Sequence, residues 1–201
     1  MRKHAAEILR NLRNHKYEES DNGIYMPSMH ATVGGAMSTA HRPAGGEFGP
    51  WEVSHNKIPA EGLIYMVGAA CAAAHVPAID QFYIAPFSGN VTPDDNWKGS
   101  NFAALATEFT AYTAAGRLPW NVEAPATTPT VSNGAAVAAA TLTFAPGGPY
   151  NLYGAAVLEA SGKGATTGKL LMAVRFGSSR LNMAAGDDLA FSYAIALTDA
   201  G

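Results

Sequence analysis

Hydrophobic and polar positions alternate without interruption near the end of this 201-residue chain. Between residues 189 and 198, one set of alternate positions carries large apolar side chains: Leu189, Phe191, Tyr193, Ile195 and Leu197. The positions between them carry small side chains: Ala190, Ser192, Ala194, Ala196 and Thr198. This period of two predicts a β-strand with its large side chains in one core, because a slip of one residue would exchange the two faces.

Shorter stretches of the same kind predict further strands, separated by turns rich in Gly, Pro, Asn and Ser. We expect these strands at residues 28–33, 51–53, 81–87, 108–112, 135–144, 151–160 and 169–176. Strands and turns in such succession favour a mainly β fold. The expected architecture is a β-sandwich or jelly-roll-like domain with one or two short helices and an N-terminal extended arm.

The helical pattern is clearest at residues 59–74. Its apolar residues recur near the period of an α-helix, and they are Leu63, Ile64, Met66, Val67 and Cys71. A shorter helix is expected at residues 100–106. Pro93, followed by two acidic residues, predicts one helical turn at residues 92–95.

The first 55 residues follow a different pattern. Residues 3–16 predict a short amphipathic helix with a narrow apolar stripe, flanked by basic residues: Ile8, Leu9, Leu12, Arg10 and Arg13. Residues 17–50 are rich in Gly and Pro. Because these segments bury little apolar surface, we expect them to become ordered only on docking, with the five named side chains at the interface. The predicted organisation is an arm at residues 1–55 and a β domain at residues 56–201.

Composition and charge narrow the function classes. Charged residues make up 14% of the chain, well below the typical quarter of a globular domain, and much of the 48% hydrophobic content is alanine. Such a surface suits a protein that neighbours partly cover, and a genome rich in Ala and Gly codons explains it equally well. The net charge of −3 provides no basic field for nucleic acid. The longest apolar run, around residues 63–74, is too short to span a membrane.

A glycine-rich segment at residues 162–169 superficially resembles a phosphate-binding loop. Lys163 stands where that motif has its first glycine, and Leu170 replaces the Ser or Thr that binds Mg²⁺. The segment also precedes a predicted strand, whereas a phosphate-binding loop opens a helix. We therefore interpret it as a flexible hairpin loop.

No catalytic or metal-binding motif emerges from the remaining polar residues, and we expect no cofactor. The six histidines are scattered through the first 75 residues without ligand spacing. Cys71 is the single cysteine and lies in an Ala-rich helix, which predicts a buried, inert thiol. The acidic pairs at residues 94–95 and 187–188 are interpreted as a helix cap and a turn. We therefore expect a protein that is not an enzyme.

Aromatic residues concentrate in the middle third of the chain. Two of them, Trp97 and Trp120, lie near prolines in loop-like surroundings. Such side chains belong to a core or anchor an interface, and the alternative is that they stack on a sugar.

Several strand and turn segments together resemble small virion structural proteins of tailed bacteriophages, of the head-decoration or tail-associated type. These segments are residues 61–65, 82–87, 90–93, 106–112, 152–155, 164–168, 174–180 and 186–189. The resemblance covers residues 56–201 and includes no catalytic signature.

The resemblance implies a virion protein made in the host bacterial cytoplasm, most simply a capsid decoration or cement protein attached through its N-terminal arm. Its partners would be the major capsid protein, or neck and tail proteins, together with further copies of itself; no nucleic acid or membrane partner is expected. Two alternatives stay open: a neck or tail adaptor that anchors fibres, and a carbohydrate-binding module for host recognition.

Overall fold

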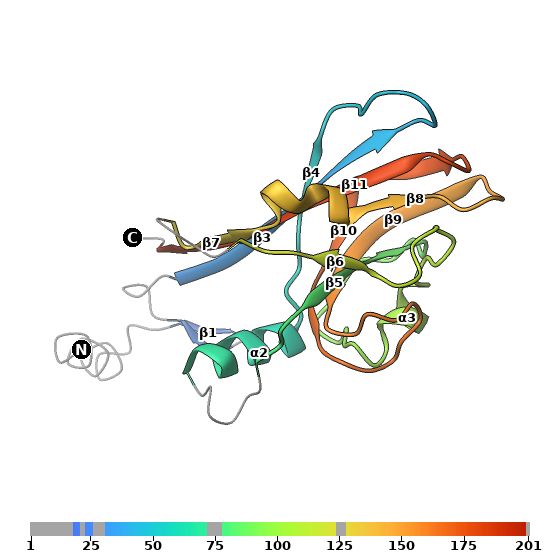
Figure 1. The fold of residues 1–201 in the computed structure, drawn as a ribbon. Helices are drawn as coiled ribbons and strands as arrows, with labels where there is room; N and C mark the ends of the chain where they lie inside the picture. Colours follow the sequence, from blue (N-terminus) through green and yellow to red (C-terminus); the bar gives the residue numbers. More distant parts are fainter. Residues whose placement is uncertain (1–17, 21–22, 26–30, 72–77, 124–127, 200–201) are drawn as a thin grey trace, which may run out of the picture. The chain divides into compact units, whose positions relative to one another are not determined.

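The computed structural model describes residues 18–20, 23–25, 31–71, 78–123 and 128–199 (Figure 1). The chain divides into two compact units, one formed by Gly34–Ala196 and the other by Met1–Val33 with Leu197–Gly201. In the smaller unit, strands β1 (Glu18–Ser20) and β2 (Gly23–Tyr25) pair in antiparallel fashion.

The protein is mainly β and contains two larger antiparallel sheets, as the sequence predicted. The first sheet has the strand order β10-β9-β5-β6. Its members are β10 (Leu170–Met183), β9 (Tyr150–Leu158), β5 (Phe82–Phe87) and β6 (Leu118–Trp120).

The second sheet has the order β4-β3-β11-β7, and β8 also pairs with β11. Its strands are β4 (Glu52–His55), β3 (Ala31–Arg42), β11 (Asp188–Asp199), β7 (Thr130–Ser132) and β8 (Thr141–Thr143). Helix α2 (Ala60–Cys71), the short helix α3 (Phe102–Leu105) and the 3₁₀ segment η1 (Gly134–Ala140) complete the fold.

Large side chains from β11 join the two sheets. Leu189, Phe191 and Tyr193 are fully buried, which confirms the predicted core face at these positions. The Phe191 ring lies 6.5 Å from that of Phe176 on β10, between centroids. Tyr193 lies 5.6 Å from the ring of Trp120 on β6. The large side chains of the alternating pattern therefore face the opposite sheet.

The first sheet is covered on its other face as well. Ala85 and Phe87 of β5 pack there in a cluster with Trp97 and Phe102, which belong to the segment between β5 and β6. Residues 154–158 of β9 are buried one after another, because both faces of this strand are covered.

Helix α2 approaches β10 so closely that one position requires glycine. A Cβ at Gly62 would lie 1.9 Å from the carbonyl oxygen of Leu171. The neighbouring Glu61 accepts hydrogen bonds from the backbone N–H groups of Gly99 and Leu170, at 2.8 and 2.7 Å. The first turn of the helix is thus attached to two other segments.

Three local predictions were wrong. A strand was predicted at residues 135–144, but the segment up to Ala140 is 3₁₀ helix and only Thr141–Thr143 form a strand. A run of alanines has little strand propensity. Residues 108–112 form isolated bridges, Phe87 with Glu108 and Tyr112 with Phe144. Residues 92–95 do not form the predicted turn of helix. The chain forms a non-helical turn there, in which the Asn96 N–H donates to the Asp94 side chain at 2.8 Å.

The predicted boundary at residue 55 also needs correction. The larger unit begins at Gly34, and it includes part of β3 and the whole of β4. Met37, Thr39 and Ala40 of β3 are buried. The glycines and prolines between residues 43 and 50 form the connection between β3 and β4. A composition typical of an extended arm therefore belongs here to a loop of the folded domain.

Candidate functional site

Both tryptophans proposed as surface anchors lie in the core. Trp97 is 3% and Trp120 4% exposed, which corrects the expectation that they are available to a partner or a sugar. Trp97 packs edge-on against Phe87, with 5.6 Å between ring centroids. The Trp120 indole N–H donates to the Tyr193 carbonyl oxygen at 3.2 Å. The other interface candidates, Ile8, Leu9, Leu12, Arg10 and Arg13, lie outside the described residues.

The acidic pair Asp187-Asp188 is structural, as the sequence suggested. Asp187 accepts hydrogen bonds from the N–H groups of Ala44 and Ala184 and contacts His41 Nε2, each at 3.0 Å. Asp188 accepts from the guanidinium of Arg42 and from the Thr143 hydroxyl. These contacts join the end of β3 to the turn before β11, and they use the acceptors that a ligand would need.

A buried ion pair stands behind the loop between β9 and β10. The side chains of Arg117 and Glu108 are 0% and 2% exposed, and two N–H···O contacts of 2.9 and 2.7 Å join them. Arg117 also donates to the carbonyl oxygens of Ala160 and Ala165, at 2.9 and 3.1 Å. The guanidinium therefore binds the loop at two points.

Further contacts hold the same loop. Glu108 accepts from the Gly164 N–H at 3.1 Å, and Lys163 Nζ donates to the carbonyl oxygens of Thr110 and Tyr112. The ammonium lies 3.6 Å from the centroid of the Tyr112 ring. Burial lowers the pKa of Lys163 from its usual value, although the nearby Glu108 carboxylate opposes this shift. The segment that resembles a phosphate-binding loop is thus fixed by hydrogen bonds to the rest of the domain, where flexibility was predicted. Its lysine, Lys163, binds backbone carbonyl groups of the protein itself.

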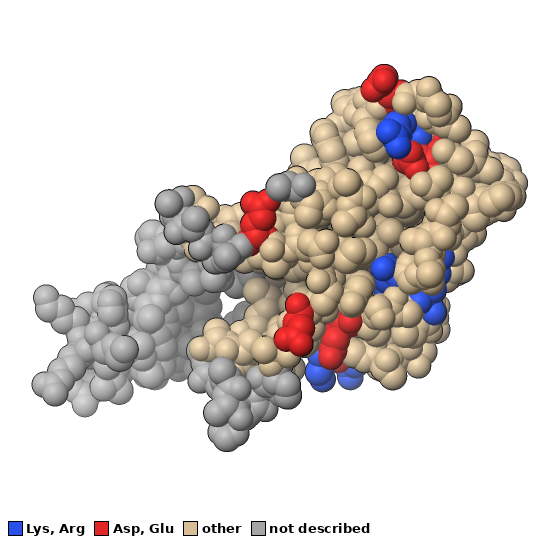
Figure 2. All heavy atoms as spheres, viewed as in Figure 1, with Lys and Arg blue, Asp and Glu red and all other residues tan. Residues whose placement is uncertain are grey.

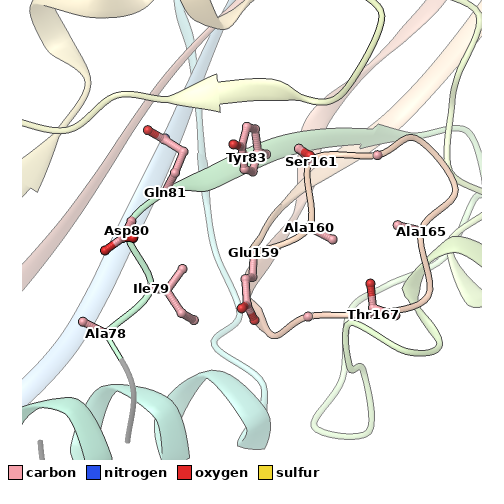
Figure 3. A pocket seen from close by; sticks show the side chains of 12 residues that line it. Ala78, Ile79, Asp80, Gln81, Tyr83, Glu159, Ala160, Ser161, Ala165 and Thr167 are labelled. Carbon is pink, nitrogen blue, oxygen red and sulfur yellow. The ribbon is translucent and has the colours of Figure 1, made fainter.

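This loop forms one wall of an open cleft of about 660 Å³ (Figure 3). The start of β5 and the residues before it form the other wall. In the view of Figure 3, Ile79 lies on one side and Thr167 on the other, with Glu159 between them, and Tyr83 stands on β5 above. The described residues that line it are Ala78, Ile79, Asp80, Gln81, Tyr83, Glu159, Ala160, Ser161, Gly162, Ala165, Thr167 and Gly168.

The described residues that line the cleft carry polar groups but no cationic side chain. Its carboxylates are those of Asp80 and Glu159, and the Glu159 carboxylate already accepts a hydrogen bond from the Lys169 N–H at 2.8 Å. Gln81 is oriented by its amide nitrogen, which donates to the carbonyl oxygens of Phe82 and Trp120. These carboxylates and the Gln81 amide offer hydrogen-bonding groups to a polar ligand.

A second hollow of about 670 Å³ shares Ile79, Asp80 and Gln81 with the cleft and extends the other way. The described residues that line it are mainly apolar, and they include Tyr65, Met66, Phe82, Trp120, Val122 and Ile195. One side of helix α2 contributes to this lining.

Another side of α2 is apolar and exposed. Leu63, Ile64 and Val67 are 37%, 73% and 63% exposed, and their spacing places them on one helix face. Figure 2 shows a described surface made largely of uncharged residues, with Lys, Arg, Asp and Glu in a few small groups. An exposed apolar stripe on such a surface is typical of a contact with another protein.

Among the described residues, no group of three or more His, Cys, Asp and Glu side chains could hold a metal ion. Nor does that part of the chain contain a helix long and apolar enough to cross a membrane. Of the histidines discussed above, His41 contacts Asp187, His55 is exposed, and the other four lie outside the described residues.

Sequence reasoning missed the groups that form the cleft. Glu108 and Arg117 are nine residues apart, and more than forty residues separate them from the loop that they bind. No local spacing in the sequence therefore indicated that they pair or that they fix this loop. Tyr83 was assigned to a strand, but it shares a face of β5 with the buried Ala85 and Phe87, so the alternation gave no sign that its ring is only partly buried.

Comparison with known proteins adds no family to this description. No family model matches the sequence, and no curated protein matches it.

Proposed function

We propose that this chain is a non-enzymatic structural protein that works by assembling into a larger particle. The particle would be the virion of a tailed bacteriophage, and the role that of a capsid decoration protein attached through its N-terminal residues. The resemblance described from the sequence supports the kind of particle. The exposed apolar face of α2 supports assembly, and it is the observation that carries the proposal.

Apolar exposure at this face is concentrated and not scattered. Single exposed apolar residues are normal on monomers, but Ile64 and Val67 lie one helical turn apart and are both more than half exposed. Covering them with a neighbouring protein would remove apolar surface from water and stabilise the contact.

The use of ionisable groups supports a structural role. Glu108 with Arg117 and Glu52 with Arg180 are ion pairs that join separate segments, and Asp187 contacts His41 across another such junction. Groups engaged in this way hold the fold together and leave fewer free for acid–base chemistry.

Binding to particles tests the proposal. The purified protein is mixed with phage heads that lack it, and the bound fraction is measured by sedimentation. Ile64→Lys combined with Val67→Lys should weaken binding at least tenfold, because two charges would have to be desolvated in an apolar contact. The matched control is Leu105→Lys, at a position 48% exposed on α3, and it should bind as the unchanged protein does.

Localisation provides the second readout. Antibody labelling of intact particles should place the protein on the head surface, whereas labelling at the neck or tail would favour the adaptor role. A protein that stays monomeric and is absent from purified particles would refute the assembly function altogether.

A further inference from the structure

The cleft beside β5 lies at the edge of the residues that pack on the outer face of the first sheet. On the outer face of β5, Ala85 and Phe87 are buried beneath Trp97 and Phe102. Tyr83 lies two residues earlier on the same face, where this cover no longer extends, and it is only partly buried. An aromatic ring is thereby left accessible at the cleft, beside the polar groups of the facing loop (Figure 3).

The loop that forms the opposite wall is held in a fixed shape. Burying a carboxylate and a guanidinium costs desolvation energy that their attraction offsets only with good geometry. Here the Glu108–Arg117 pair has that geometry, and its spare donors and acceptors bind loop residues 160, 164 and 165. A binding wall with a fixed backbone loses less conformational entropy when a ligand arrives.

The lining indicates the class of ligand. The two carboxylates disfavour an anion, and the described part of the lining contains no Lys, Arg or His that would attract one. A purely apolar ligand would take the carboxylates of Asp80 and Glu159 out of water without offering them a hydrogen bond in return. A ligand with many hydroxyl groups can both donate to the carboxylates and accept from Ser161 and Thr167, and its apolar C–H face can pack on the ring of Tyr83.

We propose that this cleft is a binding site for an uncharged saccharide. Its volume lies within the usual range of small-molecule sites. Tyr83 is the packing surface, while Asp80, Glu159, Ser161 and Thr167 supply hydrogen bonds. The site is separate from the buried tryptophans, and it does not depend on the assembly function proposed above.

Titration of the ¹⁵N-labelled full chain tests this site. The probes are neutral disaccharides of glucose, galactose and N-acetylglucosamine, with spermidine and inorganic phosphate as charged comparisons. At least one disaccharide should shift the amide signals of residues 83, 161 and 167 saturably at millimolar concentration. No saturable shift with any of these disaccharides would overturn the proposal, and so would shifts with spermidine or phosphate alone.

Two variants locate the binding. Tyr83→Ala should weaken the affinity for the active disaccharide by about tenfold, because the packing surface is lost. Thr167→Val keeps the shape of an exposed side chain and should weaken affinity by about threefold, so it decides the matter if Tyr83→Ala does not fold. Tyr153→Ala, on β9 and outside the cleft lining, is the control and should bind normally. Equal affinities for all variants would contradict the assignment.

Discussion

At the scale of single residues, polar groups that resemble site residues in the sequence form hydrogen bonds that join separate segments of the fold. Asp187 is the clearest case, because its contacts come from His41, Ala44 and Ala184. Burial would raise the pKa of this carboxyl, but the hydrogen bonds from Ala184, His41 and Ala44 outweigh it and lower the pKa from its usual value. The charged form is therefore the one that the folded state favours.

This shift predicts a pH dependence of stability. A carboxyl whose pKa is lower in the folded state stabilises the fold above its unfolded pKa, and loses that effect as the pH falls through the folded pKa. Asp187→Asn should therefore be less stable than the unchanged protein at pH 7, and the difference should shrink below about pH 4. Urea unfolding at a series of pH values measures this.

The control for this experiment is Asp95→Asn. Asp95 is half-exposed and pairs with an exposed lysine, Lys57, so its replacement should change stability little at any pH. A difference between Asp187→Asn and the unchanged protein that stays constant down to pH 2 would contradict the role of the Asp187 charge.

At the scale of elements, β11 shows how a local pattern becomes tertiary structure. Leu189, Phe191 and Tyr193 are buried against the opposite sheet, and Ile195 is partly buried. The buried side chain of Asn133 holds the backbone of the strand, donating to the Phe191 carbonyl oxygen and accepting from the Tyr193 N–H. The register of β11 is thus determined by both its side chains and its backbone.

Phe191→Ala should destabilise the protein by about 3–5 kcal/mol, because it opens a cavity between the two sheets. Ala194→Ser, on the other face of the same strand, is the matched comparison and should cost less than about 1 kcal/mol. Chemical denaturation of both variants gives the two values. Similar losses for the two substitutions would mean that the faces of β11 are not distinguished as described.

The loop between β9 and β10 depends on one distant ion pair. Glu108→Gln should cost about 3–5 kcal/mol, because it leaves the buried guanidinium of Arg117 without a compensating charge. Replacing both partners, with Glu108→Leu and Arg117→Met, should cost less than the sum of the single changes. Unfolding free energies provide the comparison, and strictly additive losses would show that the pair is not coupled.

At the scale of the whole molecule, buried hydrophobic residues run through the larger unit, from Met37 on β3 to Tyr193 on β11. The larger unit therefore has a core of its own. The assembly function, by contrast, assigns attachment to the N-terminal residues. Stability and attachment are consequently expected to be separable.

Deletion of residues 1–17 tests this separation. The shortened protein should unfold within about 0.5 kcal/mol of the full chain, yet it should fail to bind phage heads in the sedimentation assay. A shortened protein that binds heads normally would exclude attachment through this segment. One that fails to fold would show that the segment belongs to the folded core.

The sequence by itself determined the fold class, the final strand and the main helix. These features follow from a period of two or of 3.6 residues, which depends only on neighbours along the chain. Turn residues likewise placed β5 and β9 to within two positions at each end, and the start of β10 to within one. The end of β10 was missed, because the strand continues from the predicted Phe176 to Met183.

The tertiary structure decided which faces are covered and where a cleft remains. Trp97 and Trp120 are in loop-like surroundings in the sequence, yet both are buried by contacts with distant segments. Trp97 belongs to a cluster that includes Leu158 and Leu170, and Trp120 packs against Tyr193. The loop at residues 160–165 has its shape because Arg117, more than forty residues away, binds its carbonyl groups. Burial and ion pairing depend on contacts between segments far apart in the chain, and a pattern of neighbouring residues does not contain that information.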